Sequence, residues 1–286
     1  MLIEELWNWI SKIEITALAT VLLVLVGCAQ VKILSSQRQQ QRLDWAEMYR
    51  RRWIELKGDW ATVVFLGRRS TDYYQIAHHK ALQELREEVI RSSNGIASSW
   101  AQASVRNVCG MLSDLCSRIL QGHIKIQEVY PIFGTELLRQ GAPLRVLLDG
   151  SCTHLECYGS LGPTDEEEKH DNLRSEIITW LACHDGIRRR CLIMIDLLWA
   201  EACRLEDLPP YEMETAANSK ENTGHLNRAR VRNEVVRIGG WMAIKRSVHF
   251  SRYLRYAEWK ECPMSRGLSK DRLKELDAAW TKRYLN

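Results

Sequence analysis

Cations and aromatic rings gather near the C-terminal end of the sequence, where between Arg228 and Tyr256 eight residues are basic and only Glu234 is acidic. Arg and Lys neutralise phosphate groups, and aromatic faces stack on unpaired bases, so the two together form a surface for single strands or nucleotides. We therefore expect an anionic nucleotide or nucleic-acid ligand here. The expected ligand-binding residues are Arg228, Arg230, Arg232, Arg237, Lys245, Arg246, Arg252, Arg255, Trp241 and Tyr253.

Two alternative interpretations of this basic stretch stay open. The aromatic residues can belong to a hydrophobic core while the cations form an ordinary solvated face. Alternatively, the cations can contact anionic lipid headgroups at a nearby membrane, or a protein partner.

Two smaller clusters have the composition of metal or catalytic sites. Cys152, His154 and Cys157 are zinc-ligand types, but a fourth ligand at local spacing is missing. Cys183-His184-Asp185 resembles a nucleophile with its base, yet adjacent residues of a helix point in different directions. The chain also has no phosphate-binding Gly-rich loop, nucleophile elbow or paired-His zinc helix. We predict no enzyme, no catalytic residue, no metal and no cofactor.

The chain is organised around an apolar stretch near the N-terminus. Ile15–Val31 contains no charged residue, and 17 helical residues rise about 26 Å, close to the roughly 30 Å of a bilayer's hydrocarbon core. Acidic residues dominate before this stretch and basic residues after it, which favours an N-terminus outside and a cytoplasmic C-terminal region. We expect a single-pass membrane protein whose C-terminal region is cytoplasmic.

Two alternatives to an uncleaved membrane anchor remain. Leu25-Val26-Gly27-Cys28 resembles the segment before a lipidated cysteine, although such signals begin with positive charge and this one begins acidic. Whether Cys28 is lipidated stays open. The second alternative is a buried helix of a soluble protein.

One side of the expected span is polar or small. Thr16, Thr20, Leu23, Gly27 and Gln30 lie within about 80° of one another on a helix that turns roughly 100° per residue. Small and hydroxyl-bearing residues allow helices to pack closely in an oligomer, whereas several copies around a pore would turn this stripe toward water.

Composition predicts a mainly α fold, with an N-terminal transmembrane helix followed by a helical cytoplasmic region, because only 6 Pro and 16 Gly occur in 286 residues. Nine cysteines without a framework spacing are typical of reduced, partly buried thiols. The predicted divisions are 1-34, N-terminal segment and span; 35-149, juxtamembrane helical domain; 150-207, acidic connection and core helices; and 225-286, basic C-terminal helical module.

Local patterns predict the helices beyond the span. We predict that the anchor helix continues past Ser35, and that further helices cover about 72–91, about Ser99–Gln121 with Gly122 as its stop, and about Ser269–Leu285. The helical region 165–204 allows a break at Asp185-Gly186. Residues 123–139 are expected to form two short helices with a break near Pro131. The apolar segment Cys191–Trp199 is too short for a second span and is predicted to be a buried core helix. The stretch 208–224 contains Pro-Pro and many small polar residues, which is typical of a linker.

The layout resembles a known group of proteins. A short N-terminal span, a Trp- and Arg-rich segment at 43–66 and the run Gly122–Gly134 after an amphipathic helix are similar to single-span helical proteins of bacterial phage-defence operons. In plan the chain resembles the membrane effectors of the Hailong system. This resemblance implies an oligomeric ion channel that is controlled by DNA oligomers from a partner nucleotidyltransferase.

The expected function is therefore a membrane-anchored homo-oligomeric effector, a ligand-gated channel or pore that perturbs the inner membrane in phage defence. The alternative is a membrane-tethered adaptor or sensor without a pore, which recruits a cytoplasmic partner. A membrane-bound hydrolase would need an active-site thiol or metal.

Overall fold

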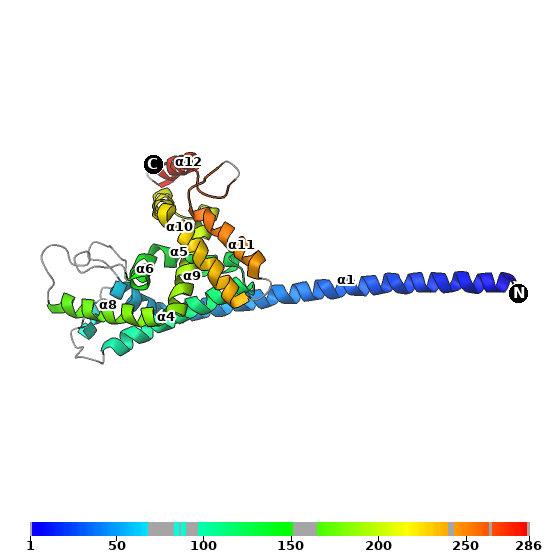
Figure 1. Ribbon diagram of the computed structural model, residues 1–286, viewed down its shortest axis with the longest axis horizontal. Coiled ribbons are helices and arrows are strands. Elements are labelled where there is room, and N and C mark those ends of the chain that lie inside the picture. Colours follow the sequence, from blue (N-terminus) through cyan, green and yellow to red (C-terminus); the bar gives the residue numbers. More distant parts are fainter. Residues whose placement is uncertain are drawn as a thin grey trace. The chain divides into compact units, whose positions relative to one another are not determined.

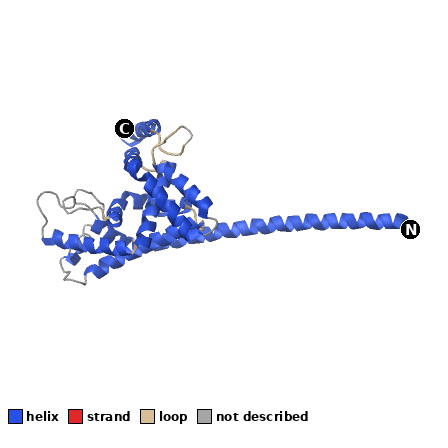
Figure 2. Cartoon of the chain, in the orientation of Figure 1, coloured by secondary structure: helices blue, strands red, loops and turns tan. Residues whose placement is uncertain are grey.

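The chain is built almost entirely from helices (Figures 1 and 2). The computed structural model describes residues 2–67, 83–85, 87–89, 97–150, 165–239, 243–262 and 265–284. These ranges contain no β-strand, and their one bridge joins Trp259 to Leu268. The predicted mainly α fold is confirmed.

Two compact units make up the chain, residues 1–47 and 48–286. Helix α1 (Leu2–Glu55) contributes to both, so the predicted continuation beyond Ser35 is confirmed. Among the described residues, α1 is the one helix that is long and apolar enough to cross a membrane, by length and composition. Its side chains from Val21 to Leu34 are exposed, apart from the partly covered Gly27.

The second unit contains the remaining helices. They are α2 (Lys57–Gly67), α4 (Ala97–Gln121), α5 (Ile126–Arg139), α6 (Gly141–Asp149), α8 (Asp165–Cys183), α9 (Asp185–Leu205), α10 (Pro210–Gly239), α11 (Ala243–Leu254), the 3-10 helix η3 (Arg255–Ala257) and α12 (Lys270–Tyr284). Helix α9 is central, since α4, α5, α6, α8, α10, α11 and η3 all contact it. The predicted divisions 35-149, 150-207 and 225-286 therefore all contribute helices to this one unit.

The sequence of α9 explains its place. Every residue from Cys191 to Leu198 is buried, and because apolar residues occupy all sides of this segment, the helix needs neighbours all round. The prediction of a buried core helix at Cys191–Trp199 is confirmed, with Trp199 itself half-buried.

The last turns of α1 belong to the core of the second unit. Tyr49 and Trp53 are buried, and the Tyr49 hydroxyl donates to Asp114 over 2.6 Å. Burial, followed by the nearby Asp114 carboxylate, raises the pKa of Tyr49. The Trp53 ring stacks on Phe133 with centroids 5.0 Å apart, and its Nε1 donates to Glu136 over 3.1 Å. These aromatic side chains fix the C-terminal end of α1 on α4 and α5.

The predicted linker at 208–224 is wrong, because α10 covers it from Pro210 onward. Proline is well tolerated at the first position of a helix, where its missing N–H has no intrahelical partner. Buried Met213, Ala216 and Ala217 then give the segment an inward face despite its polar composition. Packing of these small residues supplies the stability that local propensity does not.

The predicted break near Pro131 is also wrong, because α5 runs through this proline. Pro131 is exposed, while the flanking Tyr130 and Phe133 are buried. Proline removes one backbone hydrogen bond, and burial of two large aromatic neighbours offsets that loss.

Further predicted boundaries are confirmed. Helix α4 ends at Gln121, and Gly122 follows with a φ of 80°, the left-handed conformation that glycine adopts readily. A break separates α8 from α9 at His184, whose backbone is not helical. The expected C-terminal helix is α12, with Leu273 buried.

The expected helix at 72–91 lies largely outside the described residues.

Candidate functional site

The expected stripe of the span is open to the surroundings in a single chain. Thr20, Leu23 and Gln30 are exposed, and a Cβ built on Gly27 would have no atom within 4 Å apart from its chain neighbours and the backbone of its own helix. The side chain of Thr16 lies outside the described set. Both the packing and the pore interpretation of the stripe stay predictions.

The basic stretch divides into an inward and an outward set. In the inward set, Arg228 pairs with Glu258, and Arg255 pairs with Glu261 over 3.3 Å. The Nη1 atom of Arg230 donates to the Asn227 side chain over 3.4 Å and lies 3.7 Å from Asp196. All three cations already have a partner within the chain, although the pair of Arg255 with the exposed Glu261 lies at the surface.

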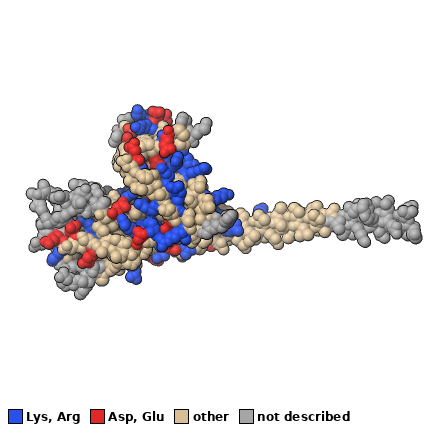
Figure 3. Space-filling view, in the orientation of Figure 1, with Lys and Arg blue, Asp and Glu red and all other residues tan. Residues whose placement is uncertain are grey.

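The outward set lies on the α10–α11 hairpin. Arg232 and Arg237 on α10, and Lys245 and Arg252 on α11, are exposed and form no ion pair with any described residue. We call these four residues the basic face. Figure 3 shows Lys and Arg side chains along this pair of helices. Apolar side chains are exposed on the same helices, namely Val236, Ile244 and Val248.

The remaining residues expected to contact a ligand are placed differently. Tyr253 is only 4% exposed; its hydroxyl donates to Glu201 and accepts from Gln127 over 3.2 Å. Its ring therefore stabilises the packing of α11 on α9 and presents no open face. Arg246 is half-buried beside Gly122, at the C-terminal end of α4, where a helix dipole favours a cation. Trp241 lies outside the described residues.

Buried carboxylates explain why several arginines turn inward. Asp196, Glu201 and Glu234 are each about 1% exposed. Glu234 accepts from Arg189 over 3.0 Å and from Arg190 over 3.2 Å. Sequence reasoning did not find these pairs, although Asp196 and Glu201 interrupt an apolar helix, which is the signal of a paired buried acid.

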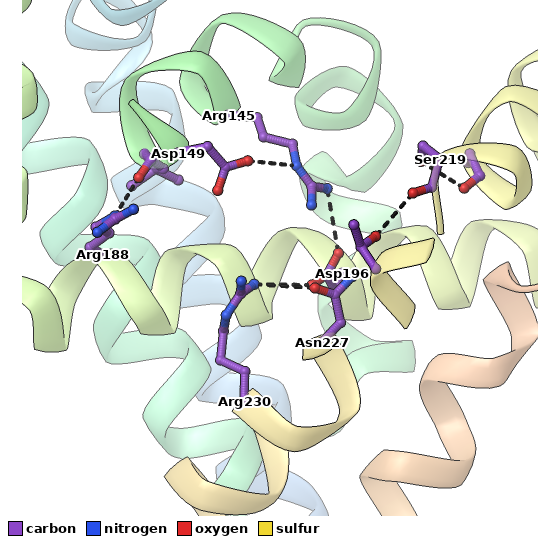
Figure 4. Close-up of polar contacts among 10 residues, drawn as sticks. Arg145, Asp149, Arg188, Asp196, Ser219, Asn227 and Arg230 are labelled. Atoms are coloured by element: carbon purple, nitrogen blue, oxygen red, sulfur yellow. Dashed lines mark hydrogen bonds and ion pairs between the residues drawn. The ribbon is translucent and has the colours of Figure 1, made fainter. Parts of the chain in front are cut away.

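Asp196 is the centre of the network in Figure 4. Arg145 bridges two carboxylates, with Nη1 3.5 Å from Asp196 and Nε 3.2 Å from Asp149. Burial opposes the charge of Arg145, but the Asp196 and Asp149 carboxylates outweigh it, and the pKa of Arg145 is raised. Arg230 approaches Asp196 from α10. Asp196 thus joins α6, α9 and α10.

A cleft of about 590 Å³ opens beside this network, between the α5–α6 junction, α9 and α10. Its lining includes Arg139, Arg145, Trp199, Tyr211 and Lys220. Lys220 is 5% exposed, and its Nζ lies 5.3 Å from the centroid of the Trp199 ring. Burial lowers the pKa of Lys220, although the Asp196 carboxylate acts in the opposite direction. Sequence reasoning missed this lysine because it placed 208–224 in a linker.

The Cys183-His184-Asp185 cluster does not assemble into a nucleophile and its base. The His184 ring stacks on Trp180 with centroids 4.3 Å apart, and its Nδ1 donates to the Trp180 carbonyl oxygen over 2.8 Å. Asp185 accepts from Arg189 instead. The three side chains therefore do not act on one another.

The buried thiols behave as small hydrophobic groups. Burial raises the pKa of Cys203 to about 12 and also raises the pKa of Cys116 and Cys191, so these thiols stay protonated near neutral pH. Cys152, His154 and Cys157 lie outside the described residues, and no three metal-ligand side chains gather within the ranges that the structure covers.

Comparison of the chain with family models, with curated proteins and with solved structures found no match in any of the three.

Proposed function

We propose that this chain is a homo-oligomeric effector anchored in the bacterial inner membrane, with its N-terminus outside and its second unit in the cytoplasm. Its α1 helices surround a pore, and an anionic nucleotide or DNA oligomer on the basic face controls the opening of that pore. A partner nucleotidyltransferase supplies the ligand, and the setting is defence against phage.

The observation that carries this proposal is the continuity of α1. One helix contains the apolar stretch Ile15–Val31 and also the buried anchors Tyr49 and Trp53. An unbroken backbone ladder transmits rotation and translation along its axis better than a flexible linker does. A rearrangement of the second unit therefore has a direct path into the span.

The exposed surface of α1 supports an apolar environment around it. Side chains from Val21 to Val26 are each more than half exposed in the single chain, and soluble proteins rarely leave so long an apolar surface in water. Lipid on one side and neighbouring copies on the other would cover this surface.

The basic face supports an anionic ligand. Its four cations lack ion-pair partners among the described residues, so a phosphate backbone can neutralise them without first breaking ion pairs. Because Tyr253 is buried, contacts to phosphate groups rather than base stacking on that ring would supply the affinity.

Reconstitution into planar bilayers tests the pore. The full chain should conduct when a short oligodeoxynucleotide is added, and Thr20→Leu together with Thr16→Leu should change unit conductance without loss of expression. Val21→Leu, on another side of the helix, is the matched control and should leave conductance unchanged. Equal conductance in all three proteins would argue against a pore lined by the stripe.

Charge reversal tests the basic face. Arg232→Glu with Arg237→Glu should reduce oligonucleotide affinity at least tenfold, measured by fluorescence anisotropy. Lys274→Glu with Lys282→Glu makes the same charge change at exposed sites of α12 and should have a smaller effect. Arg230→Glu is a less specific test than Arg232→Glu, because it would place a second carboxylate beside Asp196. Similar losses in both double variants would indicate a nonspecific effect of net charge.

A second candidate function is a tethered adaptor without a pore. The apolar side chains Val236, Ile244 and Val248 among the cations favour it, because a mixed surface is typical of protein interfaces. An adaptor predicts no conductance with any ligand, and indifference to the Thr16 and Thr20 substitutions as long as the anchor is retained. Native mass spectrometry separates the two further, since a pore needs several subunits.

A further inference from the structure

The cleft between α9 and α10 is a separate feature from the basic face, and none of the basic-face residues lines it. Its volume of about 590 Å³ falls within the roughly 300–1,000 Å³ that is usual for small-molecule sites. The lining combines cations, hydroxyl groups and aromatic rings, all within the second unit.

Lys220 is a residue of the cleft lining whose buried amine lacks a hydrogen-bond acceptor in the part of the chain that the structure describes. Its amine makes no hydrogen bond or ion pair with any described residue, even though the residue is 95% buried. A buried ammonium group without an acceptor is costly. The acids that act on Lys220 are engaged elsewhere, since Asp196 pairs with Arg145 over 3.5 Å and Glu258 pairs with Arg228. An anion in the cleft would supply the missing acceptor.

The lining of the cleft contains a second cation without an ion-pair partner among the described residues. Arg139 lines the cleft, is exposed, and forms no ion pair with any described residue. The one lining carboxylate apart from Asp149 is Glu212, which accepts from the Tyr211 hydroxyl over 3.0 Å. Two cations of the lining are therefore without a counterion among the described residues, whereas both of its carboxylates have donors.

The remaining lining side chains indicate what accompanies the anionic group. Tyr211 is 66% exposed and presents a ring face, whereas the Trp199 ring is covered by Lys220. The hydroxyls of Thr215, Ser219 and Thr223 donate to backbone carbonyl oxygens, so each hydroxyl oxygen keeps lone pairs for a ligand N–H or O–H. These groups suit a flat ring with polar edges.

We infer that this cleft binds a small organic anion that carries a flat ring, with the anionic group on Lys220 and the ring against Tyr211. Phosphate esters and carboxylates share this chemistry. The inference goes beyond the proposed function, because it concerns different residues and does not require the chain to conduct ions.

Calorimetric titration of the detergent-solubilised full chain tests the inference. Adenosine 5′-monophosphate represents the phosphate esters, and benzoate represents the carboxylates. Adenosine and inorganic phosphate test the two halves of adenosine 5′-monophosphate separately. At least one aromatic anion should bind with a Kd below 1 mM, and adenosine should bind at least tenfold more weakly than its monophosphate if the phosphate ester is the preferred source. Failure of both aromatic anions to bind at 1 mM would overturn the inference.

Substitution of Lys220 locates the site. Lys220→Met should weaken binding of the preferred anion at least tenfold while the melting temperature stays at or above that of the original chain. The matched control is Lys270→Met, because Lys270 also lies over an indole, 5.4 Å from the Trp259 centroid, but is exposed and outside the cleft. Equal affinity in Lys220→Met and in the original chain would overturn the assignment.

A second variant keeps the inference testable if Lys220→Met does not fold. Tyr211→Ala removes an exposed ring, which leaves the core intact, and should weaken the aromatic anion about fivefold. Its effect on inorganic phosphate should be negligible. An unchanged affinity for the aromatic anion would remove Tyr211 from the site and contradict the placement of the ring.

Discussion

Two apolar helices of this chain have opposite surroundings. The stretch Ile15–Val31 of α1 has exposed side chains wherever they are described, whereas Cys191–Leu198 is buried within α9, the helix that most other elements of the second unit contact. Both stretches are rich in aliphatic residues, Leu and Val in the first and Leu and Ile in the second. In this chain, apolar composition alone therefore does not decide whether a helix is exposed or buried.

Polar residues and their partners make the difference between the two. The apolar stretch of α1 has no charged residue, so lipid can surround it without an unpaired charge. Helix α9 instead contains two buried acids. Asp196 pairs with Arg145 of α6, and Glu201 pairs with Arg204 of α9 itself. A helix with such acids needs a protein core that supplies the cations, because an unpaired buried carboxylate is very costly.

The largest expected effect comes from breaking the pairs of α9. Asp196→Ala leaves Arg145 and Arg230 without their shared carboxylate, and we expect a loss of roughly 3–4 kcal/mol in the free energy of unfolding of the second unit. Urea titration followed by near-UV circular dichroism measures this loss. Asp277→Ala, at an exposed site of α12, should cost little. Comparable losses in the two variants would contradict the central role of Asp196.

Adding a charge to α1 is the converse experiment. Leu23→Arg places a cation in the apolar stretch, and we expect insertion to become less favourable by about 3 kcal/mol if this stretch spans the bilayer. The fraction that remains in the membrane after carbonate extraction reports this change. Leu43→Arg, an exposed site beyond the apolar stretch, is the control. Unchanged extraction of Leu23→Arg would count against a membrane span.

Two glycines, one in each of the two units, also differ in the space around them, and the expected effect of substitution is smaller. A Cβ on Gly67 would lie 2.1 Å from the backbone oxygen of Pro143, so Gly67→Ala should destabilise the second unit by about 2 kcal/mol. A Cβ on Gly27 meets nothing in the single chain. Gly27→Ala should therefore leave unfolding of the second unit unchanged and weaken self-association only if the stripe packs between copies. Thermal unfolding and native mass spectrometry measure the two effects.

The smallest expected effect is a gain of stability at Lys220. Its folded pKa lies below the ordinary value of about 10.4, so the unfolded chain binds more protons and stability rises with pH between the two values. Lys220→Met should therefore stabilise the ligand-free protein by about 1–2 kcal/mol near neutral pH. This gain should shrink as the pH approaches 10.4.

The groups that face Lys220 set the sign of that prediction. Asp196, Cys203 and Glu258 favour the charged amine, Arg145 opposes it, and burial outweighs them all. Denaturant titrations between pH 7 and pH 10 measure the trend. A gain that grows with pH, or a loss near neutral pH, would show that Lys220 has an internal counterion.

Much of the helical architecture was predictable from local patterns. Local patterns predicted α4, its end at Gly122 and α12, and these three are confirmed; the break expected at Asp185-Gly186 lies at His184. The two errors, at Pro131 and at 208–224, have a common cause. In both places proline signals favoured an interruption, and burial of Tyr130 and Phe133 or of Met213 and Ala217 stabilises a continuous helix.

The expected ligand residues show where such patterns stop being informative. Spacing on α10 separates Arg230 from Arg232 by less than one turn, yet the first faces Asp196 and the second is exposed. Only the position of α10 against α9 decides which cation has a partner. The environment of Lys220 was equally unpredictable from local patterns, because its burial depends on Trp199 and on the α6 side of the cleft.

By itself, the sequence determined the helical class, the one apolar stretch long enough for a membrane and the concentration of charge near the C-terminal end, because these follow from composition and local periodicity. The tertiary structure alone decided which arginines are internal partners and which form the basic face. It also decided that an apolar helix with two acids becomes the centre of the core. The physical reason is that a buried charge is stable only beside its counterion, and counterions such as Arg145 come from distant positions in the chain.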